Sequence, residues 1–214
     1  MTNIIELIAK NIESGDREES VANVNIALAA NIKPEEIMNN GLIEGMNVLG
    51  ERWKRNEVFV PEVLIAARAL TSALEILRPL LEKSGVKPKG KALIGTVKGD
   101  LHDIGKNLVK MMLVGSGFEV IDMGVDVSGE QFVEGINKES PDIILLSALL
   151  TTTMPQQGEI INALKEANVR DKVKVMVGGA PVTKAFAENI GADAYTPDAA
   201  SAAEKAIEFV TNKQ

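Results

Sequence analysis

The stretch ALIGTVKGDLHDIG, residues 92–105, decides the fold of this chain. It begins with an apolar run typical of a β-strand, Ala92–Val97, and a helical pattern follows it, Lys106–Leu113. Between the two lies the only histidine of the sequence, His102, with the carboxylate of Asp100 two residues before it. A strand that passes through a short polar loop into a helix predicts the first repeat of a parallel sheet covered by helices.

The alternation of short β-rich runs and helical patterns continues to the end of the chain. Five such repeats predict an α/β domain with a doubly wound, five-stranded parallel sheet of the flavodoxin/Rossmann-like kind, covered by helices on both faces. The expected strands are Lys91–Val97, Glu119–Asp122, Ile143–Ser147, Val173–Val177 and Ala192–Tyr195, and the expected helices lie near 105–115, 129–139, 155–167, 182–189 and 199–212.

The first part of the chain has a different period. From residue 3 to about 83 the apolar residues recur at helical spacing. Asn3–Glu13 and Asp16–Ala29 are expected to be amphipathic helices, and two more should begin at Pro34 and Pro61, where the fixed φ of proline and its missing N–H cost least. Four helices with short connections predict a small four-helix bundle.

A polar segment rich in glycine and proline, KSGVKPKG, separates the two patterns. Such a composition is typical of an exposed linker. The sequence therefore predicts a helical bundle over residues 1–84, a linker over 85–90 and the parallel-sheet domain over 91–214.

Composition excludes several classes of function. The formal net charge of -7 disfavours nucleic acid or an anionic membrane as the main partner, since both are bound through basic patches. The absence of cysteine from the 214 residues excludes disulfides, thiolate nucleophiles, iron–sulfur clusters and Cys-type zinc sites. The beginning of the chain lacks the pattern of a signal peptide, and no apolar run approaches the length of about 18 residues that suggests a membrane span. We expect an unprocessed cytoplasmic protein.

The loops that follow four of the expected strands are unusual. They contain GDLHDIG, Ser147–Thr153, Gly178–Pro181 and Tyr195–Asp198. In doubly wound sheets, ligands bind beyond the carboxyl ends of the strands, where these loops would converge. We therefore expect one ligand site at this edge.

His102 is the residue at this edge with the chemistry of a metal ligand. One ring nitrogen can face outward while the other donates to a carboxylate, Asp100 or Asp103, which fixes the tautomer. A single histidine cannot build a multi-histidine metal site, so the remaining ligands would have to come from a cofactor. A macrocycle that needs one axial protein ligand meets this condition, and both a haem and a corrinoid remain open at this point.

Three motifs in the right loops carry a resemblance to a known family. Asp100-x-His102-x-x-Gly105, then Ser147-x-Leu149, then Gly178-Gly179 resemble the signature of cobalamin-binding domains. The resemblance implies cobalamin or a related corrinoid bound base-off and His-on, with His102 as the axial cobalt ligand held by Asp100. The implied cofactor-binding residues are Asp100, His102, Asp103, Ile104, Gly105, Ser147, Leu149, Thr151, Thr153, Gly178, Gly179, Tyr195 and Thr196.

By the same resemblance, the nucleotide tail of the cofactor is threaded into the sheet domain. Ser147, Leu149 and Thr151 would line it, and Gly178-Gly179 would leave room for it because glycine lacks a Cβ. Tyr195 and Thr196 would lie near its buried end.

The segment Val48–Val63 is similar to the cap of the methyl-carrying branch of the family, which includes cobalamin-dependent methionine synthase and the small corrinoid proteins of methylotrophic systems. In that branch a four-helix bundle covers the methyl-bearing face of the corrin, and Trp53 and Val60 fall at the shielding positions. The linker would let this cap swing aside.

The resemblance implies a methyl carrier rather than a stand-alone catalyst. Its partners would be a substrate-specific methyltransferase, a second methyltransferase that uses coenzyme M or tetrahydrofolate, and an ATP-dependent corrinoid reductive activase. Three alternatives remain open: a cobalamin sensor, the cobalamin-binding subunit of a carbon-skeleton mutase, and a flavodoxin-like domain without a corrin. The sequence leaves open whether the methyl donor is methanol, a methylamine, a betaine, a thiol or an aryl ether.

Overall fold

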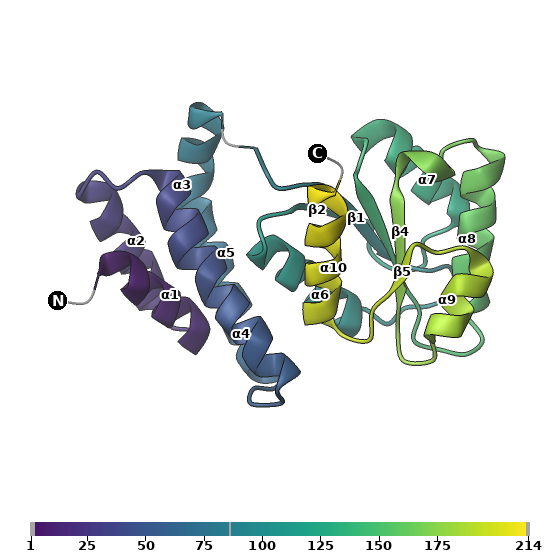
Figure 1. Ribbon diagram of the computed structural model, residues 1–214, viewed down its shortest axis with the longest axis horizontal. Helices are drawn as coiled ribbons and strands as arrows, with labels where there is room; N and C mark the ends of the chain where they lie inside the picture. Colours follow the sequence, from purple (N-terminus) through teal and green to yellow (C-terminus); the bar gives the residue numbers. More distant parts are fainter. Residues whose placement is uncertain (1–2, 86, 213–214) are drawn as a thin grey trace. The chain divides into compact units, whose positions relative to one another are not determined.

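The computed structural model describes residues 3–85 and 87–212, which form two compact units (Figure 1). One unit consists of the helices α1 to α5, and the other contains the sheet with the helices that follow it. The predicted linker over 85–90 includes Val86, which lies outside the described residues, as do residues 1–2 and 213–214 of the two predicted domains.

The first unit contains the four predicted helical segments. The first two helices begin at polar caps, because the side chain of Asn3 accepts a hydrogen bond from the backbone N–H of Ile5 and that of Asp16 from Glu19. Gly15 separates them in the left-handed conformation, with φ of +75°. The segments are α1 (Ile4–Ser14), α2 (Arg17–Ala29), the continuous run of α3 (Pro34–Glu36), η1 (Ile37–Ile43) and α4 (Glu44–Lys54), and α5 (Val60–Ser84).

Two details of this unit differ from the regular helices that the sequence predicts. The helix that begins at Pro34 is interrupted by η1, a π-helical segment in which Gly41 packs closely against Ile8 of α1. The last helix begins at Val60, one residue before Pro61. Pro61 still lies in the first turn, where its missing N–H leaves no hydrogen bond unmade.

The second unit is the predicted five-stranded parallel sheet, with strand order β2-β1-β3-β4-β5. The strands are β1 (Lys91–Thr96), β2 (Glu119–Asp122), β3 (Ile143–Ser147), β4 (Lys174–Gly178) and β5 (Ala194–Tyr195), and the helices are α6 (Ile104–Gly115), α7 (Gly129–Glu139), α8 (Pro155–Glu166), the short 3₁₀-helix η2 (Arg170–Lys172), α9 (Lys184–Ile190) and α10 (Ala199–Thr211). The last strand is shorter than predicted, since only two of its residues pair with β4.

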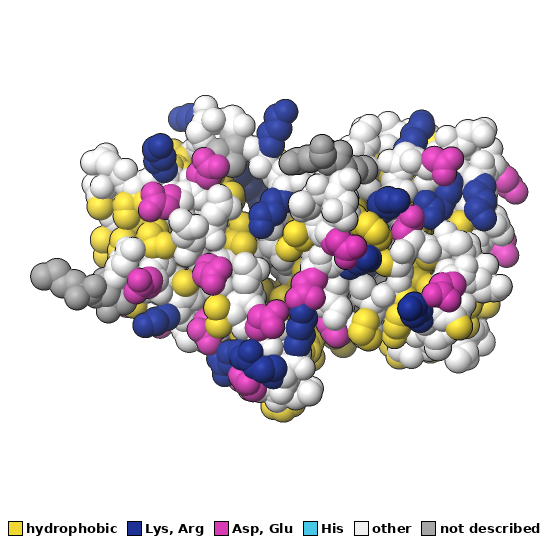
Figure 2. All heavy atoms as spheres, viewed as in Figure 1, with side chains coloured by type: hydrophobic (Ala, Val, Ile, Leu, Met, Phe, Trp, Pro, Cys, Tyr) yellow, Lys and Arg dark blue, Asp and Glu magenta, His cyan; other side chains and the backbone are white. Residues whose placement is uncertain are grey.

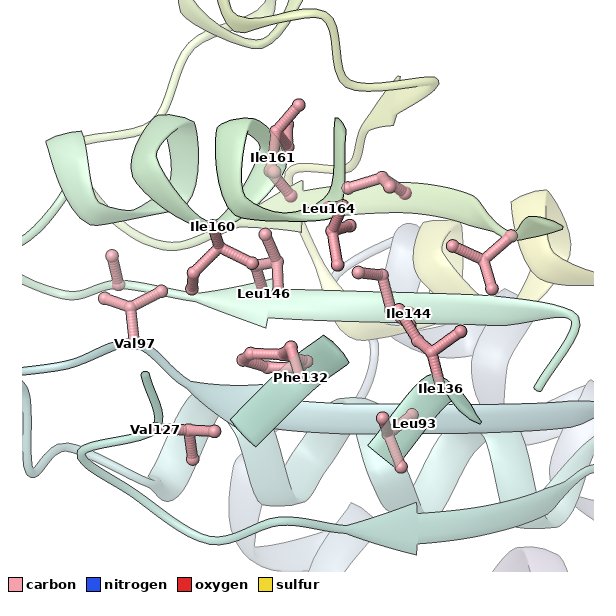
Figure 3. Packing of buried hydrophobic residues seen from close by; sticks show 14 of the residues in the cluster. Leu93, Val97, Val127, Phe132, Ile136, Ile144, Leu146, Ile160, Ile161 and Leu164 are labelled. Atoms are coloured by element: carbon pink, nitrogen blue, oxygen red, sulfur yellow. The ribbon is translucent and has the colours of Figure 1, made fainter. Parts of the chain in front are cut away.

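Helices cover both faces of the sheet, as its continuous apolar strands require. In Figure 1, α6 and α10 lie on one face and α7, α8 and α9 on the other. Figure 3 shows Phe132 of α7 and Ile160 of α8 packed against the side chains of Leu146 and its neighbours on β1 and β3. Phe132 is fully buried, and the strand positions that face it alternate with positions that face α6 and α10.

The strand order creates the place where a ligand can enter. From β1 the chain runs first to β2 on one side and then, after α7, to β3 on the other side of β1. The loops that leave the carboxyl ends of β1 and β3 therefore diverge and form the crevice of a topological switch point. His102 lies in the first of these loops, and the residues from Ala148 to Met154 form the second.

Candidate functional site

The carboxylate of Asp100 is fully buried and holds His102 in place. Its Oδ1 accepts the backbone N–H of His102 at 3.0 Å and is bonded to the ring nitrogen Nδ1 at 2.7 Å. Both bonds lie within the loop between β1 and α6. The imidazole therefore has a fixed position relative to its own backbone.

The second oxygen of the same carboxylate reaches the loop after β3. Oδ2 accepts the backbone N–H of Leu149 at 2.7 Å and the hydroxyl of Thr153 at 2.6 Å. Thr153 is itself buried, with 7% of its surface exposed. Asp100 thus joins the two loops that flank the switch point, and its carboxylate makes four hydrogen bonds to groups of the protein.

These bonds keep the buried carboxyl group ionised. Burial by itself raises the pKa of Asp100, but the hydrogen bonds from Thr153, from the backbone of Leu149 and from His102 together hold that pKa well below its usual range. Because an ionised carboxylate can only accept, we assign the proton of the neutral imidazole to Nδ1. The other nitrogen, Nε2, then keeps its lone pair.

The imidazole of His102 is partly open to solvent. Its side chain is 50% exposed, and Nε2 makes no hydrogen bond to any part of the protein that the structure describes. The described residues also contain no group of three His, Cys, Asp or Glu side chains that could hold a metal ion. This donor set fits a metal whose other ligands arrive with it, as in a corrinoid.

Exposed apolar side chains lie in the same two loops and at the start of α6. Leu101 and Ile104 are 73% and 70% exposed, and Leu149 and Leu150 of the facing loop are 43% and 42% exposed. A Cβ placed on Gly105 would meet no atom within 4 Å, so the space beside the loop is open. Exposed apolar groups of this size are typical of a binding surface for an apolar ligand face.

The strand ends beside this surface approach each other closely. Ser147 pairs with Gly178 in the register of β3 and β4. Gly179 has φ of +129°, and a Cβ at this position would collide with the carbonyl oxygen of Ala148. The glycine is thus required first by backbone packing. The sequence suggests a different reason for this glycine, namely space for the nucleotide tail of the cofactor, and that reason stays a prediction.

The remaining predicted residues lie at several places around the edge. Thr151 is exposed in the loop after β3, and Asp103 is exposed and accepts the side-chain amide of Asn107 at 3.0 Å. Thr196 follows β5, and its carbonyl oxygen faces Gly178. Tyr195 is half-buried and packs against the apolar cluster of α7 and α8.

Trp53 and Val60 belong to the helical unit. Trp53 is half-buried in the last turn of α4, and Val60 is 37% exposed at the start of α5. Neighbouring Phe59 is 65% exposed, more than either of them. That Trp53 and Val60 shield a cofactor stays a prediction.

Sequence reasoning missed two groups that support the histidine loop. The hydroxyl of Thr96, buried at the end of β1, donates to the carbonyl of His102 at 2.9 Å. The second group is the ammonium of Lys106, whose side chain is only 2% exposed. It donates to Asp122 of β2 at 2.6 Å and to the side-chain oxygen of Asn107 at 2.8 Å. Of these two groups, only Thr96 could have been found from the sequence, because it is a threonine at the end of an apolar strand.

The ion pair of Lys106 anchors the first turn of α6 to β2. Burial raises the pKa of Asp122, but hydrogen bonds from Lys106, from the backbone of Gly124 and from Lys110 lower it to about 2. Lys110 adds a second ammonium at 3.0 Å. The helix α6, which begins two residues after His102, is therefore fixed to the sheet.

Neither acidic nor basic side chains dominate the face of the molecule drawn in Figure 2, where the two kinds are interspersed. None of the described helices has both the length and the apolar character needed to cross a bilayer.

Comparison with known proteins identifies the class of ligand that the chain binds. The B12 binding domain matches residues 90–207, and a second B12 binding domain matches residues 4–78. The expected cobalamin or corrinoid binding is thereby confirmed, and the alternative of a flavodoxin-like domain without a corrin is wrong.

Relatives match the chain along nearly all of its length. It is 44% identical over 205 residues to the trimethylamine corrinoid protein 2 of Methanosarcina acetivorans, with 94% of each chain covered. It is 46% identical over 180 residues to the dimethylamine corrinoid protein 1 of the same organism, with 84% of each covered. A chain in the crystal structure of the methanol:cobalamin methyltransferase complex of Methanosarcina barkeri superposes with a TM-score of 0.86 at 31% identity, covering 97% of this chain and 80% of that one. The chain belongs to the B12-binding corrinoid proteins of methyltransferase systems.

Proposed function

We propose that this corrinoid protein carries a methyl group from a methylamine-specific methyltransferase to a second methyltransferase, whose acceptor is coenzyme M or tetrahydrofolate. The observation that carries the proposal is the Asp100–His102 pair, in which Nδ1 lies 2.7 Å from the buried carboxylate and the imidazole is half-exposed. The cobalt of the bound corrinoid supplies the site to which the methyl group is attached.

In this proposal His102 is the lower axial ligand, and the corrinoid is bound base-off and His-on. Asp100 accepts the proton of Nδ1, so that Nε2 carries the lone pair of the neutral imidazole, and the negative charge of Asp100 strengthens the imidazole as a donor. Thr153 and the backbone of Leu149 prevent the carboxylate from turning away.

The apolar groups at the edge hold the macrocycle and exclude water. Leu101, Ile104 and Leu149 are the exposed side chains that can pack against its lower face. We assign further contacts, those with the nucleotide tail, to Ser147, Leu149, Thr151, Gly178, Gly179, Tyr195 and Thr196. Trp53 and Val60 of the helical unit are proposed to shield the methyl group.

The methylamine substrate is inferred from the relatives, which are corrinoid proteins for trimethylamine and dimethylamine. Besides the two methyltransferases, we propose an ATP-dependent reductive activase as a partner. A carrier that serves such enzymes works beside them in the cytoplasm.

The choice of methyl donor can be tested with the corrinoid-loaded protein and the methyltransferases for trimethylamine, dimethylamine and methanol. We expect methylation, followed by the absorption spectrum of the cofactor, with one of the two methylamine enzymes and not with the methanol enzyme. Methylation by the methanol enzyme alone would contradict the assignment of a methylamine as the methyl donor. It would leave the assignment of His102 as cobalt ligand unaffected.

The ligand assignment is tested by His102→Ala. Protein loaded with hydroxocobalamin should show a base-off spectrum with a histidine ligand, and the variant should lose that ligand and bind the cofactor more weakly. Lys98→Ala, which changes an exposed side chain of the same loop, is the matched control and should behave as the unchanged protein. An unchanged spectrum in His102→Ala would exclude the histidine as ligand.

The buried carboxylate predicts how stability depends on pH. Because the pKa of Asp100 is lower in the folded protein than in the unfolded chain, its stabilisation is complete above the ordinary aspartate pKa and is lost as the pH falls. Asp100→Asn should therefore destabilise the protein by about 1–3 kcal/mol at neutral pH. The difference in unfolding free energy should shrink as urea titrations are taken down towards about pH 3.

Thr153→Val removes one donor to the same carboxylate and should cost less than Asp100→Asn. A loss of stability in Asp100→Asn that is the same at every pH would show that the charge of Asp100 does not contribute.

A further inference from the structure

Asp126 has an unusual backbone conformation. Its φ is +56°, in the left-handed region that costs energy for residues other than glycine. Four other described non-glycine residues have positive φ, and each follows the end of a helix, where this conformation is a common terminator. They are Asn31, Asn56, Ser140 and Asn168. Asp126 instead lies between β2 and α7, so helix termination does not explain it.

Both the side chain and the backbone of Asp126 bind the turn that leads to His102. Its Oδ1 accepts the backbone N–H of Gly99 at 2.7 Å, and its own N–H donates to the carbonyl of Asp100 at 3.1 Å. Gly99 is itself left-handed, with φ of +79°. The turn is thus held by a residue from the loop after β2.

The left-handed conformation allows the two groups of Asp126 to face the same turn. Local strain that the surrounding structure maintains is a frequent mark of functional sites. The turn that is held here contains Asp100, whose carboxylate fixes the imidazole of His102. A small shift of the Asp100 backbone would move that carboxylate relative to all four of its donors.

We propose that Asp126 is a positioning residue for His102, acting through the Gly99–Asp100 turn. The proposal rests on the proposed function, in which His102 is the axial ligand of the corrinoid. In this role the loop after β2 helps the loops after β1 and β3 to fix the position of the His102 imidazole. Asp126 needs no contact with the cofactor for this role.

Three substitutions of Asp126 distinguish the effect of its side chain from the effect of its backbone conformation. Asp126→Gly keeps the left-handed backbone accessible and removes the acceptor. Asp126→Asn keeps an oxygen acceptor and a residue type that tolerates this conformation. Asp126→Ala removes the acceptor and raises the strain. Asn168→Gly, at a left-handed position after α8, is the matched control.

The single histidine of the chain makes the position of His102 directly measurable without any cofactor. In protein with isotope-labelled histidine, nuclear magnetic resonance reports the tautomer and the exchange of the Nδ1 proton with water. We expect about tenfold faster exchange in Asp126→Gly and a similar loss of hydroxocobalamin affinity, the factor that corresponds to about 1.4 kcal/mol. Asp126→Asn and Asn168→Gly should stay within about threefold of the unchanged protein, a difference below about 0.7 kcal/mol.

Asp126→Ala should show at least the effect of the glycine variant; if it does not fold, the glycine and asparagine variants decide the question. Unchanged proton exchange and affinity in Asp126→Gly would overturn the proposal. Faster exchange in Asp126→Gly, combined with an unchanged cobalt spectrum in His102→Ala, would leave Asp126 as the positioning residue of the histidine and would reject the ligand role instead.

Discussion

The buried carboxylate of Asp100 is the interaction on which the site depends. A buried charge is costly unless hydrogen bonds compensate for the lost water, and here four donors do so. Two of them belong to His102 and two to the loop after β3, so one carboxylate orients the imidazole and joins the two sides of the switch point. The histidine can be exposed and yet fixed because its partner is buried.

The sequence predicted the sheet well because parallel strands that are buried on both faces are continuous apolar runs bounded by glycine, proline and polar residues. Four of the five strands lie within a residue or so of their expected bounds. The π-helical segment from Ile37 to Ile43 could not be predicted, since a regular α-helix and an α-helix interrupted by a π-helical turn share much the same local composition. The shortened β5 depends on pairing with β4, which local patterns do not specify.

At the site, the sequence singles out side chains whose chemistry is rare in this chain, and it gives no sign of contacts made at long range. His102 and Asp100 stand out as the sole histidine and a carboxylate two residues away. The bond between Asp100 and the backbone of Leu149 joins positions 49 residues apart and uses an N–H that every residue except proline has. The hydrogen bond between Asp126 and Gly99 could not be predicted for the same reason, because only the fold brings these two residues together.

Binding of cobalt by Nε2 of His102 can be measured by electron paramagnetic resonance of the protein loaded with cobalamin in its paramagnetic cobalt(II) form. Because the chain has one histidine, labelling histidine with the spin-half isotope of nitrogen changes a single group. With His102 as the cobalt ligand, we expect the nitrogen superhyperfine splitting of the cobalt signal to change from a triplet to a doublet on labelling. A splitting that stays a triplet, or that is absent, would exclude His102 as the ligand.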